Sequence, residues 1–324
     1  MKNSKEKKVA KKPSKAKKAG IIAAIVIVSI LVAAIVGGIV YMNRGPEVHY
    51  PAWVHEEFLK RDNNEMEDGA NVRIMSYNVL VDLWGGKERP CITDAKPVAV
   101  RCEQLKNILD YYSPDVVALQ EFCEAWHLNA DRYIEKDYTV IFDNPLEYTS
   151  MAYNHNKVNL IKSEKILYSQ GNSKTMRYIA WALFEKKDTK EQFIVSNTHL
   201  DFGSNKAMQD IQVVELMDKL KELKAEYKVP IFSLGDYNAV EKPIPDEAFL
   251  GIDIYEQFAK ESTLIDAKYI EGINHHDELQ EWSFPTWDHI FVTDDVEVKS
   301  YDVLSNNYYK SISDHFPIFV DAAI

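Results

Sequence analysis

The stretch Ile231-Phe-Ser-Leu-Gly-Asp-Tyr-Asn238 joins a short apolar run to a small cluster of polar residues. Short runs rich in Val, Ile and Phe predict buried strands. Polar side chains at the ends of such strands converge on one rim of a sheet, where they can hold a metal ion and perform acid–base chemistry. Five other stretches combine a run with a cluster: Arg73-Ile-Met-Ser-Tyr-Asn78, Val116-Val-Ala-Leu-Gln-Glu121, Phe193-Ile-Val-Ser-Asn-Thr-His-Leu-Asp201, Trp287-Asp-His-Ile-Phe-Val-Thr293 and Ser313-Asp-His-Phe-Pro-Ile318.

The predicted strands outnumber the predicted helices. Strands are expected over 72–79, 115–121, 138–142, 150–154, 165–169, 177–185, 192–199, 230–235, 288–293, 297–303 and 316–321. Helices are expected over 98–112, 123–135, 205–227 and 254–262. Because several strands follow one another without a helix between them, the pattern argues against a pure βαβ barrel. It favours an α/β protein with two packed sheets flanked by helices.

The expected helix over 205–227 has the clearest periodicity. Its apolar residues recur at helical spacing, at Met208, Ile211, Val214, Met217 and Leu220. A stripe of this kind predicts a face that packs against the core rather than a cofactor site.

The first 44 residues differ from the rest in composition. Residues 1–20 hold nine lysines, whereas the 22 residues from Ile21 to Met42 carry no charge. Twenty-two helical residues span roughly 33 Å, enough to cross a bilayer core of about 30 Å. We therefore expect a basic tail at 1–20 and a retained transmembrane helix at 21–42. The alternatives are a buried helix and a cleaved signal peptide, whose apolar region is usually shorter.

Charge is distributed unevenly along the chain. Lys and Arg number 38 and Asp and Glu number 50, so the net charge is −12; residues 1–44 carry +9 and residues 45–324 carry −21. Basic flanks stay in the cytoplasm, so the tail is expected to be cytoplasmic and the chain after the span extracytoplasmic, at the cell membrane. An acidic domain has no overall attraction for nucleic acid, which weakens a duplex-binding role without excluding one.

The extracytoplasmic part is expected to form one catalytic domain. Residues 43–70 contain Pro, Gly and a polar run and indicate a linker, whereas 71–324 show no further low-complexity break and no repeat. The three cysteines, Cys91, Cys102 and Cys123, allow one Cys91–Cys102 disulfide or three free or buried thiols. Their spacing does not match a zinc site.

The six clusters together supply mainly oxygen ligands. Sites of this kind favour magnesium, manganese or calcium over zinc, and magnesium commonly uses one or two carboxylates together with phosphate oxygens of a substrate. The set predicts attack by water on a phosphoester, with a metal ion and imidazoles stabilising charge on the phosphoryl group. The clusters hold five carboxylates, two amides and three imidazoles: Glu121, Asp201, Asp236, Asp288, Asp314, Asn78, Asn238, His199, His289 and His315.

The order of the motifs resembles that of the endonuclease/exonuclease/phosphatase superfamily, which includes deoxyribonucleases, apurinic-site endonucleases and neutral sphingomyelinases. The most specific pieces are Leu-Gln-Glu121, Asn-Thr-His-Leu-Asp201, Gly-Asp-Tyr-Asn238 and Ser-Asp-His315, in that order. Arg177-Tyr-Ile-Ala-Trp-Ala-Leu-Phe184 also resembles the strand that precedes the Thr-His motif. The resemblance extends from about Arg73 to Val320 and implies a four-layer α/β/β/α sandwich of two mixed sheets.

The resemblance implies a metal site that binds Mg²⁺ or Mn²⁺, with Ca²⁺ as an alternative. Glu121 is expected to be the principal ligand, Asn78 to lie close to the same ion, and Asp314 to contribute to a metal site.

The resemblance also implies the catalytic roles. His199 is expected to contact the scissile phosphate and stabilise or protonate it, and Asp236 to orient or deprotonate the attacking water. Asn238 is expected to bind a phosphate oxygen, while Asp288 pairs with His315 and fixes its tautomer.

Three residues depart from the family pattern or have open roles. His289 has no assignable family role, and both a structural and a substrate-side role are open. Two roles are open for Asp201: a direct part in the chemistry, or support of its loop alone. Glu147 precedes the expected strand at 150–154 and is a candidate partner for His199.

The sequence predicts a membrane-anchored, divalent-metal-dependent phosphoesterase. The preferred hypothesis is an extracytoplasmic nuclease. The alternative within the same chemistry is a phosphatase or sphingomyelinase-like phosphodiesterase that acts on a lipid or a small phosphorylated headgroup. A third reading is a non-catalytic binding domain on the same fold. No protein partner can be inferred, and the catalytic domain is expected to be monomeric.

Overall fold

The strand β1 (Val72–Asn78) lies at the centre of the first of two sheets, and every one of its residues is buried. Its side chains alternate between two apolar surroundings. Met75 and Tyr77 belong to a core under the helices, whereas Val72 and Ile74 belong to a core shared with the second sheet. Both of its faces are covered, so the polar residues Arg73 and Ser76 are buried together with the apolar ones.

The computed structural model describes residues 64–81, 98–142, 144, 148–171, 176–202, 206–244, 251–276, 283–305 and 307–324. Within these ranges no helix is long and apolar enough to cross a membrane. The predicted basic tail at 1–20 and transmembrane helix at 21–42 lie outside the described residues, as does most of the predicted linker.

The first sheet has six strands in the order β11-β12-β1-β2-β4-β3. The strand β1 is parallel to β2 and antiparallel to β12, so the sheet is mixed. The other pairs are antiparallel. The bounds are β2 (Val116–Gln120), β3 (Tyr138–Ile141), β4 (Thr149–Asn154), β11 (Glu297–Val303) and β12 (Ile318–Ala323).

The second sheet has six strands in the order β5-β6-β7-β8-β10-β9. It is also mixed, because β7 and β8 are parallel and the remaining pairs are antiparallel. The bounds are β5 (Val158–Leu167), β6 (Tyr178–Lys186), β7 (Gln192–His199), β8 (Ile231–Asp236), β9 (Ile265–Asp266) and β10 (Asp288–Val292).

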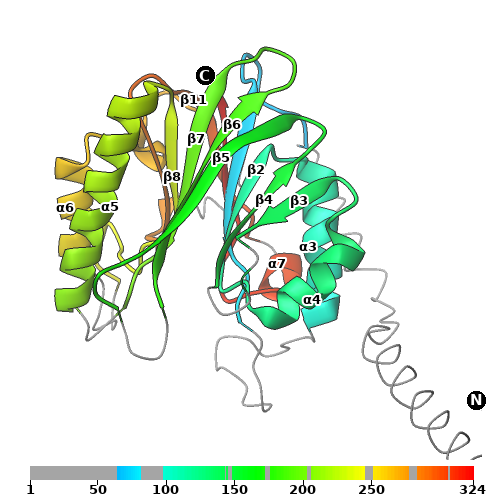
Figure 1. Cartoon of the computed structure of the whole chain (residues 1–324), viewed down its shortest axis with the longest axis horizontal. Coiled ribbons are helices and arrows are strands. Elements are labelled where there is room, and N and C mark those ends of the chain that lie inside the picture. Colours follow the sequence, from blue (N-terminus) through cyan, green and yellow to red (C-terminus); the bar gives the residue numbers. More distant parts are fainter. Residues whose placement is uncertain are drawn as a thin grey trace, which may run out of the picture. The chain divides into compact units, whose positions relative to one another are not determined.

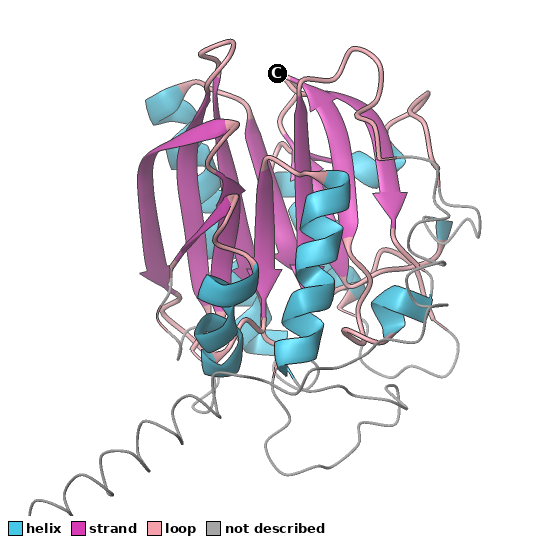
Figure 2. Ribbon diagram, turned by 90° about the vertical axis from the view of Figure 1, so that its right-hand side faces the viewer, coloured by secondary structure: helices cyan, strands magenta, loops and turns pink. Residues whose placement is uncertain are grey.

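Helices cover the outer face of each sheet (Figures 1 and 2). Three apolar clusters separate the four layers: one under α3 and α4, one between the sheets, and one under α5 and α6. The predicted sandwich of two packed mixed sheets with flanking helices is confirmed. The helical bounds are α3 (Val98–Tyr112), α4 (Glu124–Tyr133), α5 (Lys206–Tyr227), α6 (Ile252–Glu261), α7 (Asn307–Lys310) and the 3₁₀ turn η2 (Ala267–Tyr269).

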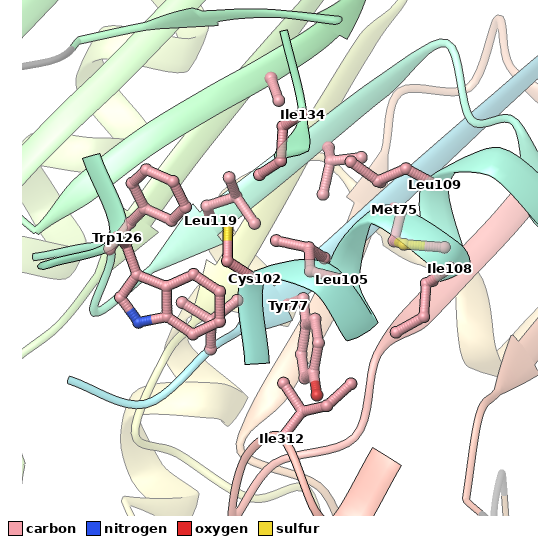
Figure 3. Close-up of a cluster of buried hydrophobic side chains, with 14 of the residues drawn as sticks. Met75, Tyr77, Cys102, Leu105, Ile108, Leu109, Leu119, Trp126, Ile134 and Ile312 are labelled. Carbon is pink, nitrogen blue, oxygen red and sulfur yellow. The ribbon is translucent and has the colours of Figure 1, made fainter. Parts of the chain in front are cut away.

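The cluster under α3 and α4 illustrates how the helices are held. Leu105, Ile108 and Leu109 of α3 share this buried cluster with Tyr77 of β1, and Trp126 of α4 also belongs to it (Figure 3). Cys102 is a buried free thiol in the same cluster; Cys91, its possible disulfide partner, lies outside the described residues.

The apolar stripe predicted for α5 was partly wrong. Met217 and Leu220 are buried, but Ile211 and Val214 are 40% and 41% exposed. The buried face instead contains Val213, Leu216 and Leu223, together with Gln209 and Gln212. The two glutamines bond the loops after β7 and β8, so the buried face combines apolar residues at helical spacing with two hydrogen-bonding side chains.

The strand β5 was predicted at 165–169 but spans Val158–Leu167. It is an edge strand, and its middle residues Ile161 to Glu164 are exposed. Charged residues on an edge strand prevent pairing with other chains, and they also remove the apolar signal on which the prediction relied. The short elements β9, η2 and α7 were not predicted.

Candidate active site

The polar clusters meet where the parallel strands of both sheets end. Asn78 ends β1 and Glu121 follows β2 in the first sheet, while His199 ends β7 and Asp236 ends β8 in the second. The strand pairing fixes this, because His199 lies opposite Asp236 in the β7–β8 register. Strands that run in the same direction deliver their last residues to the same edge.

Asn78 connects the two sheets at the centre of the site. Its Nδ2 donates to Oδ2 of Asp236 at 3.0 Å and lies 3.5 Å from Oε1 of Glu121. Its Oδ1 accepts from the backbone N–H of Leu80. In this arrangement Asn78 turns an N–H towards the carboxylates and orients both of them, rather than offering an oxygen to an ion.

Glu121 has an unusual backbone, and the described residues that bond its carboxylate are neutral donors. Its φ of 58° is in the left-handed region, which costs a non-glycine residue about 1 kcal/mol or more and is often found at functional sites. Besides the Asn78 amide, its carboxylate accepts from the N–H of Val81 at 2.8 Å. No described residue forms an ion pair with it, so its charge remains available to a cation.

Asp236 is buried, with 2% of its surface exposed. Its Oδ1 accepts from the N–H of Asn238 at 2.9 Å, and its Oδ2 lies 3.3 Å from Nε2 of His199 and 3.8 Å from Nε2 of His315. Burial raises the pKa of Asp236 to about 6, although the charge of His315 opposes the rise. A carboxylate with a pKa near neutrality suits a general base.

The residue before Asp236 must be glycine. Gly235 has φ of +143°, and a Cβ there would lie 2.0 Å from the carbonyl oxygen of Thr198 on β7. Only glycine allows β8 to approach β7 closely enough at this point, which places Asp236 beside His199.

His315 is held by Asp288, as the resemblance predicted. Nδ1 of His315 lies 2.6 Å from Oδ2 of Asp288. Burial alone would lower the pKa of His315, but the charges of Asp288 and Asp236 raise it well above its usual value. The ring is therefore an imidazolium at neutral pH. Ser313 holds the loop by donating to the carbonyl of Asn78 and accepting from the N–H of His315.

His199 is neutral, in contrast to the charged His315. Burial lowers the pKa of His199 well below its usual value, and the charges of Arg177 and His315 lower it further. The ring is neutral, and Nε2 is the donor because it faces the Asp236 carboxylate. Nδ1 has no hydrogen-bond partner among the described residues, and Glu147, the candidate partner, lies outside them.

Asn238 and Asp201 lie beside this centre. Asn238 has φ of 47° and donates from Nδ2 to the carbonyl of Leu200, which ties the loops after β7 and β8 together. Asp201 accepts from Gln212 of α5 and lies 3.7 Å from Nε of Arg177. These contacts give Asp201 a supporting role in its loop.

The only cluster of potential metal-binding side chains found among the described residues is Asp236, Asp288 and His315, whose ligand atoms lie within 4.8 Å of one another. It does not contain the predicted Glu121 or Asp314. In this cluster Nδ1 of His315 and Oδ2 of Asp288 already bond each other, which reduces the number of ligand atoms free to take a metal. Glu121 fits a hard cation better, because its carboxylate accepts hydrogen bonds from Asn78 and Val81 and forms no ion pair with a described residue.

A family model described as the endonuclease/exonuclease/phosphatase family matches residues 75–315, which include every site residue described above. The chain belongs to this family. Its members are phosphoesterases. The order of the motifs, the fold and the range matched by the family model therefore all indicate the same family.

Relatives within this family share modest identity with the chain. Nocturnin of Mus musculus is 25% identical over 255 residues, which are 73% of this chain and 57% of nocturnin. The chain thus spans little more than half the length of that curated relative.

Solved structures share the fold. A mannosyl-6-phosphatase of Bacteroides thetaiotaomicron has a TM-score of 0.59 at 19% identity, covering 78% of this chain and 100% of the other. TDP2 of D. rerio, solved with a single-strand DNA product, has a TM-score of 0.53 at 18% identity, covering 78% and 99%.

Arg177 is the site residue that the sequence reasoning missed. It is 8% exposed, its charge acts on Asp201, Asp236 and Glu121, and burial lowers its pKa. Its Nε has no hydrogen-bond partner among the described residues. The sequence did contain a signal for Arg177. It is the first residue of the strand motif that supported the resemblance to this endonuclease/exonuclease/phosphatase family.

A cavity of about 230 Å³ opens beside His315. Asp288 and Asp314 line its polar end, which places Asp314 near the site but outside the cluster of three. The remaining walls are mainly apolar and include Phe284, Trp287 and Phe316. The cavity can therefore take a group attached to a phosphate at the site.

Proposed function

We propose that this chain is a divalent-metal-dependent phosphodiesterase whose general base is Asp236. The observation that carries the proposal is a buried carboxylate with a pKa of about 6 between a neutral and a charged histidine. Groups whose environments separate their protonation states in this way are typical of acid–base sites.

Asp236 would accept the proton of the attacking water, since it is ionised at neutral pH and its orientation is fixed by Asn78 and Asn238. The new bond from the water oxygen to phosphorus forms as the bond to the departing group breaks. The departing oxygen takes up a proton from solvent, and Asp236 returns the proton that it accepted to solvent. The His315 imidazolium would stabilise negative charge on the phosphoryl oxygens, with Asp288 keeping the ring charged and oriented.

His199 and Arg177 would complete the phosphoryl site. The neutral His199 ring can donate a hydrogen bond from Nε2, and in the substrate-free protein its low pKa makes it a poor acid. Arg177 provides a fixed positive charge near Asp236 and Glu121. When bound, a divalent ion at Glu121 would supply Lewis-acid stabilisation of the phosphoryl oxygens.

A substrate panel tests this proposal. The full-length chain is assayed with Mg²⁺, Mn²⁺ or Ca²⁺ on bis(4-nitrophenyl) phosphate, DNA, RNA, sphingomyelin and inositol phosphates. We expect metal-dependent hydrolysis of at least one diester, and much slower hydrolysis by Asp236→Asn. A wild-type chain that hydrolyses none of them with any of the ions would refute the proposal.

Nucleic acid is our first candidate substrate. Support comes from the family and from the shared fold of TDP2 solved with a single-strand DNA product. That likeness shows the fold alone, and the mannosyl-6-phosphatase shares the same fold, so the fold does not select the substrate. Hydrolysis of DNA and RNA in the substrate panel tests whether nucleic acid is the substrate.

A lipid phosphodiester is the second candidate, because two exposed apolar side chains are next to site residues. Met176 precedes Arg177 and is 50% exposed, and Phe202 follows Asp201 and is 60% exposed. Exposed apolar groups beside a phosphate site would contact acyl chains. Faster hydrolysis of sphingomyelin than of DNA, reduced by Met176→Ser/Phe202→Ser, would favour this candidate.

We further propose the domain arrangement predicted from the sequence: a cytoplasmic tail at 1–20, a membrane anchor at 21–42, a linker at 43–70 and an extracytoplasmic catalytic domain at 71–324. The support is the charge-free stretch of 22 residues next to nine lysines. External protease should remove the domain from intact cells. A domain that resists cleavage until lysis would reverse the orientation.

A further inference from the structure

Four charged side chains that the reaction does not use lie buried near its loops. They are Glu241, Asp266, Lys268 and His289, and we refer to them as the buried charge cluster. Their side chains are between 1% and 4% exposed. Burying charges is costly, so a set of four needs a physical account.

The first pair of the buried charge cluster fixes the loop before β10. Nζ of Lys268 lies 2.5 Å from Oε1 of Glu241 and also donates to the carbonyl of Phe284. Oε2 of Glu241 accepts from the N–H of Thr286 at 3.1 Å. Both members therefore hold the backbone of residues 284–286, which line the cavity beside His315.

The second pair fixes the loop after β8. Nε2 of His289 lies 2.8 Å from the carbonyl oxygen of Ala239, and Nδ1 lies 3.2 Å from Oδ2 of Asp266. A carbonyl and a carboxylate both only accept, so both ring nitrogens donate, as those of an imidazolium do. The ring packs against Tyr237 and Tyr255, which answers the open question about His289: its role is internal, not substrate-side.

The two loops held by the buried charge cluster carry reaction residues. Ala239 follows Asn238 directly, and the N–H of Tyr237 donates to the carbonyl of Trp287 at 2.9 Å, joining the two loops. The N–H of Asp288 donates to Oγ1 of Thr286. Asp288 and His289 are consecutive in β10, so their side chains point to opposite faces of the sheet.

We propose that the buried charge cluster is a positioning device for the reaction, which fixes Asp288 against His315 and Asp236 against the water by holding the two loops that carry them. This inference rests on the proposed function for its kinetic readout. The ion pairs fasten the two loops to η2 and β10, and the loops in turn set the directions of Asp236 and Asp288. Misplacing a reacting group by about 1 Å can cost about a hundredfold in rate.

The main variant removes one ion pair without leaving a buried charge. Lys268→Met/Glu241→Gln keeps an amide oxygen that accepts from Thr286 but loses the pair and the bond to Phe284. Lys268→Arg keeps the charge and serves as the conservative rescue. Should the double variant not fold, Glu241→Gln carries the same test, since it removes only the charge.

The matched control breaks a buried ion pair at the far end of the sheets. Nζ of Lys186 lies 2.9 Å from Oδ1 of Asp115, with side chains 7% and 0% exposed. Asp115 precedes β2 whereas Glu121 follows it, so the strand of five residues, roughly 16 Å long, separates the control from the site. Lys186→Met/Asp115→Asn should lower stability without touching the reaction.

Two readouts separate positioning from folding. The first is kcat and KM for bis(4-nitrophenyl) phosphate at a temperature where every variant is folded. The second needs no activity: the Nδ1 proton of His315 in its short bond to Asp288 should give a downfield NMR resonance, assigned by its loss in His315→Asn.

We expect the Lys268→Met/Glu241→Gln variant to lose about tenfold or more in kcat, with KM changed less than kcat, and to shift or broaden the His315 resonance. Lys268→Arg and the Lys186→Met/Asp115→Asn control should keep the resonance and stay within about twofold of wild-type kcat. A folded main variant with wild-type kcat and resonance overturns the inference, as does an equal loss in the control. A wild-type chain that is inactive but shows the expected resonance changes refutes the proposed function alone.

Discussion

At the scale of single residues, Glu121 and Asp236 divide the negative charge of the site into two uses. Asp236 lies between two histidines and has a raised pKa, whereas in the described part of the chain Glu121 accepts from the neutral N–H groups of Asn78 and Val81. The first arrangement suits a base that gains and loses a proton. The second suits a permanent charge that attracts a cation.

Replacing Glu121 by glutamine should remove metal-dependent activity. The amide keeps the size of the side chain but not its charge, so we expect kcat/KM to fall by at least about a hundredfold and Mn²⁺ affinity to fall in parallel. Steady-state kinetics and calorimetric Mn²⁺ titration measure the two effects. Glu124→Gln, an exposed neighbour in α4, is the matched control and should behave as wild type.

The rate should depend on pH through Asp236 and His315. Burial raises the pKa of Asp236 to about 6, so below that pH the carboxyl is protonated, cannot accept a proton, and kcat/KM falls. The pKa of His315 is raised well above 6.5 by Asp288 and Asp236 despite burial, so the charged ring is lost, and the rate falls again, only at alkaline pH. A pH profile of kcat/KM without a decline on the acidic side near pH 6 contradicts the role of Asp236.

Several site residues could be predicted because each carries its own local signal. A carboxylate, amide or imidazole directly after an apolar run identifies a strand end, and the structure brings Asn78, Glu121, His199 and Asp236 together as expected. Arg177 was missed because it precedes its strand β6 and resembles a surface cation. The orientation of the Asn78 amide also could not be foreseen, since it depends on the N–H of Leu80.

At the scale of elements, the spacing of apolar residues predicted a strand or helix correctly where one face of that element is buried. The boundaries of α3 were predicted correctly, and those of β7 as well. The prediction was incomplete for β5, whose exposed centre is charged, and for the face of α5. In both cases neighbouring elements, not the segment itself, determine what is buried.

The exposed side of α5 gives a direct test. Ile211→Ala and Val214→Ala should each change the free energy of unfolding by no more than about 0.5 kcal/mol, because both side chains remain about 40% exposed. Leu216→Ala removes a fully buried side chain and should cost about 2–5 kcal/mol. Urea denaturation of the three variants provides the comparison. Equal costs at Ile211 and Leu216 would show that the predicted stripe, and not the observed face, packs against the sheet.

At the scale of the whole molecule, the site exists only because two sheets pack against each other. Below it, Nε2 of Gln120 on β2 donates to Oδ1 of Asn197 on β7 at 2.8 Å, and Asn197 donates to the carbonyls of Leu119 and Ser150. These buried bonds fix the relative position of the sheets. The reaction residues therefore depend on an interface that no single segment encodes.

Removing divalent ions should abolish activity without unfolding the protein, since none of the residues proposed to bind an ion belongs to the three apolar clusters. After chelation we expect an unchanged far-UV circular dichroism spectrum, a modestly lower midpoint of thermal unfolding, and recovery of activity on adding Mg²⁺ or Mn²⁺. Full activity after exhaustive chelation would contradict the metal requirement.

The sequence by itself determined the strand ends, the types of reacting group and their order along the chain, because side-chain polarity and period are local properties. Only the tertiary structure decided which groups meet and which protonation state each adopts. Asn78 and Asp236 are 158 positions apart and belong to different sheets, yet they share a hydrogen bond. The pKa values follow from burial and from charges on distant segments, and both arise only when the two sheets close on each other.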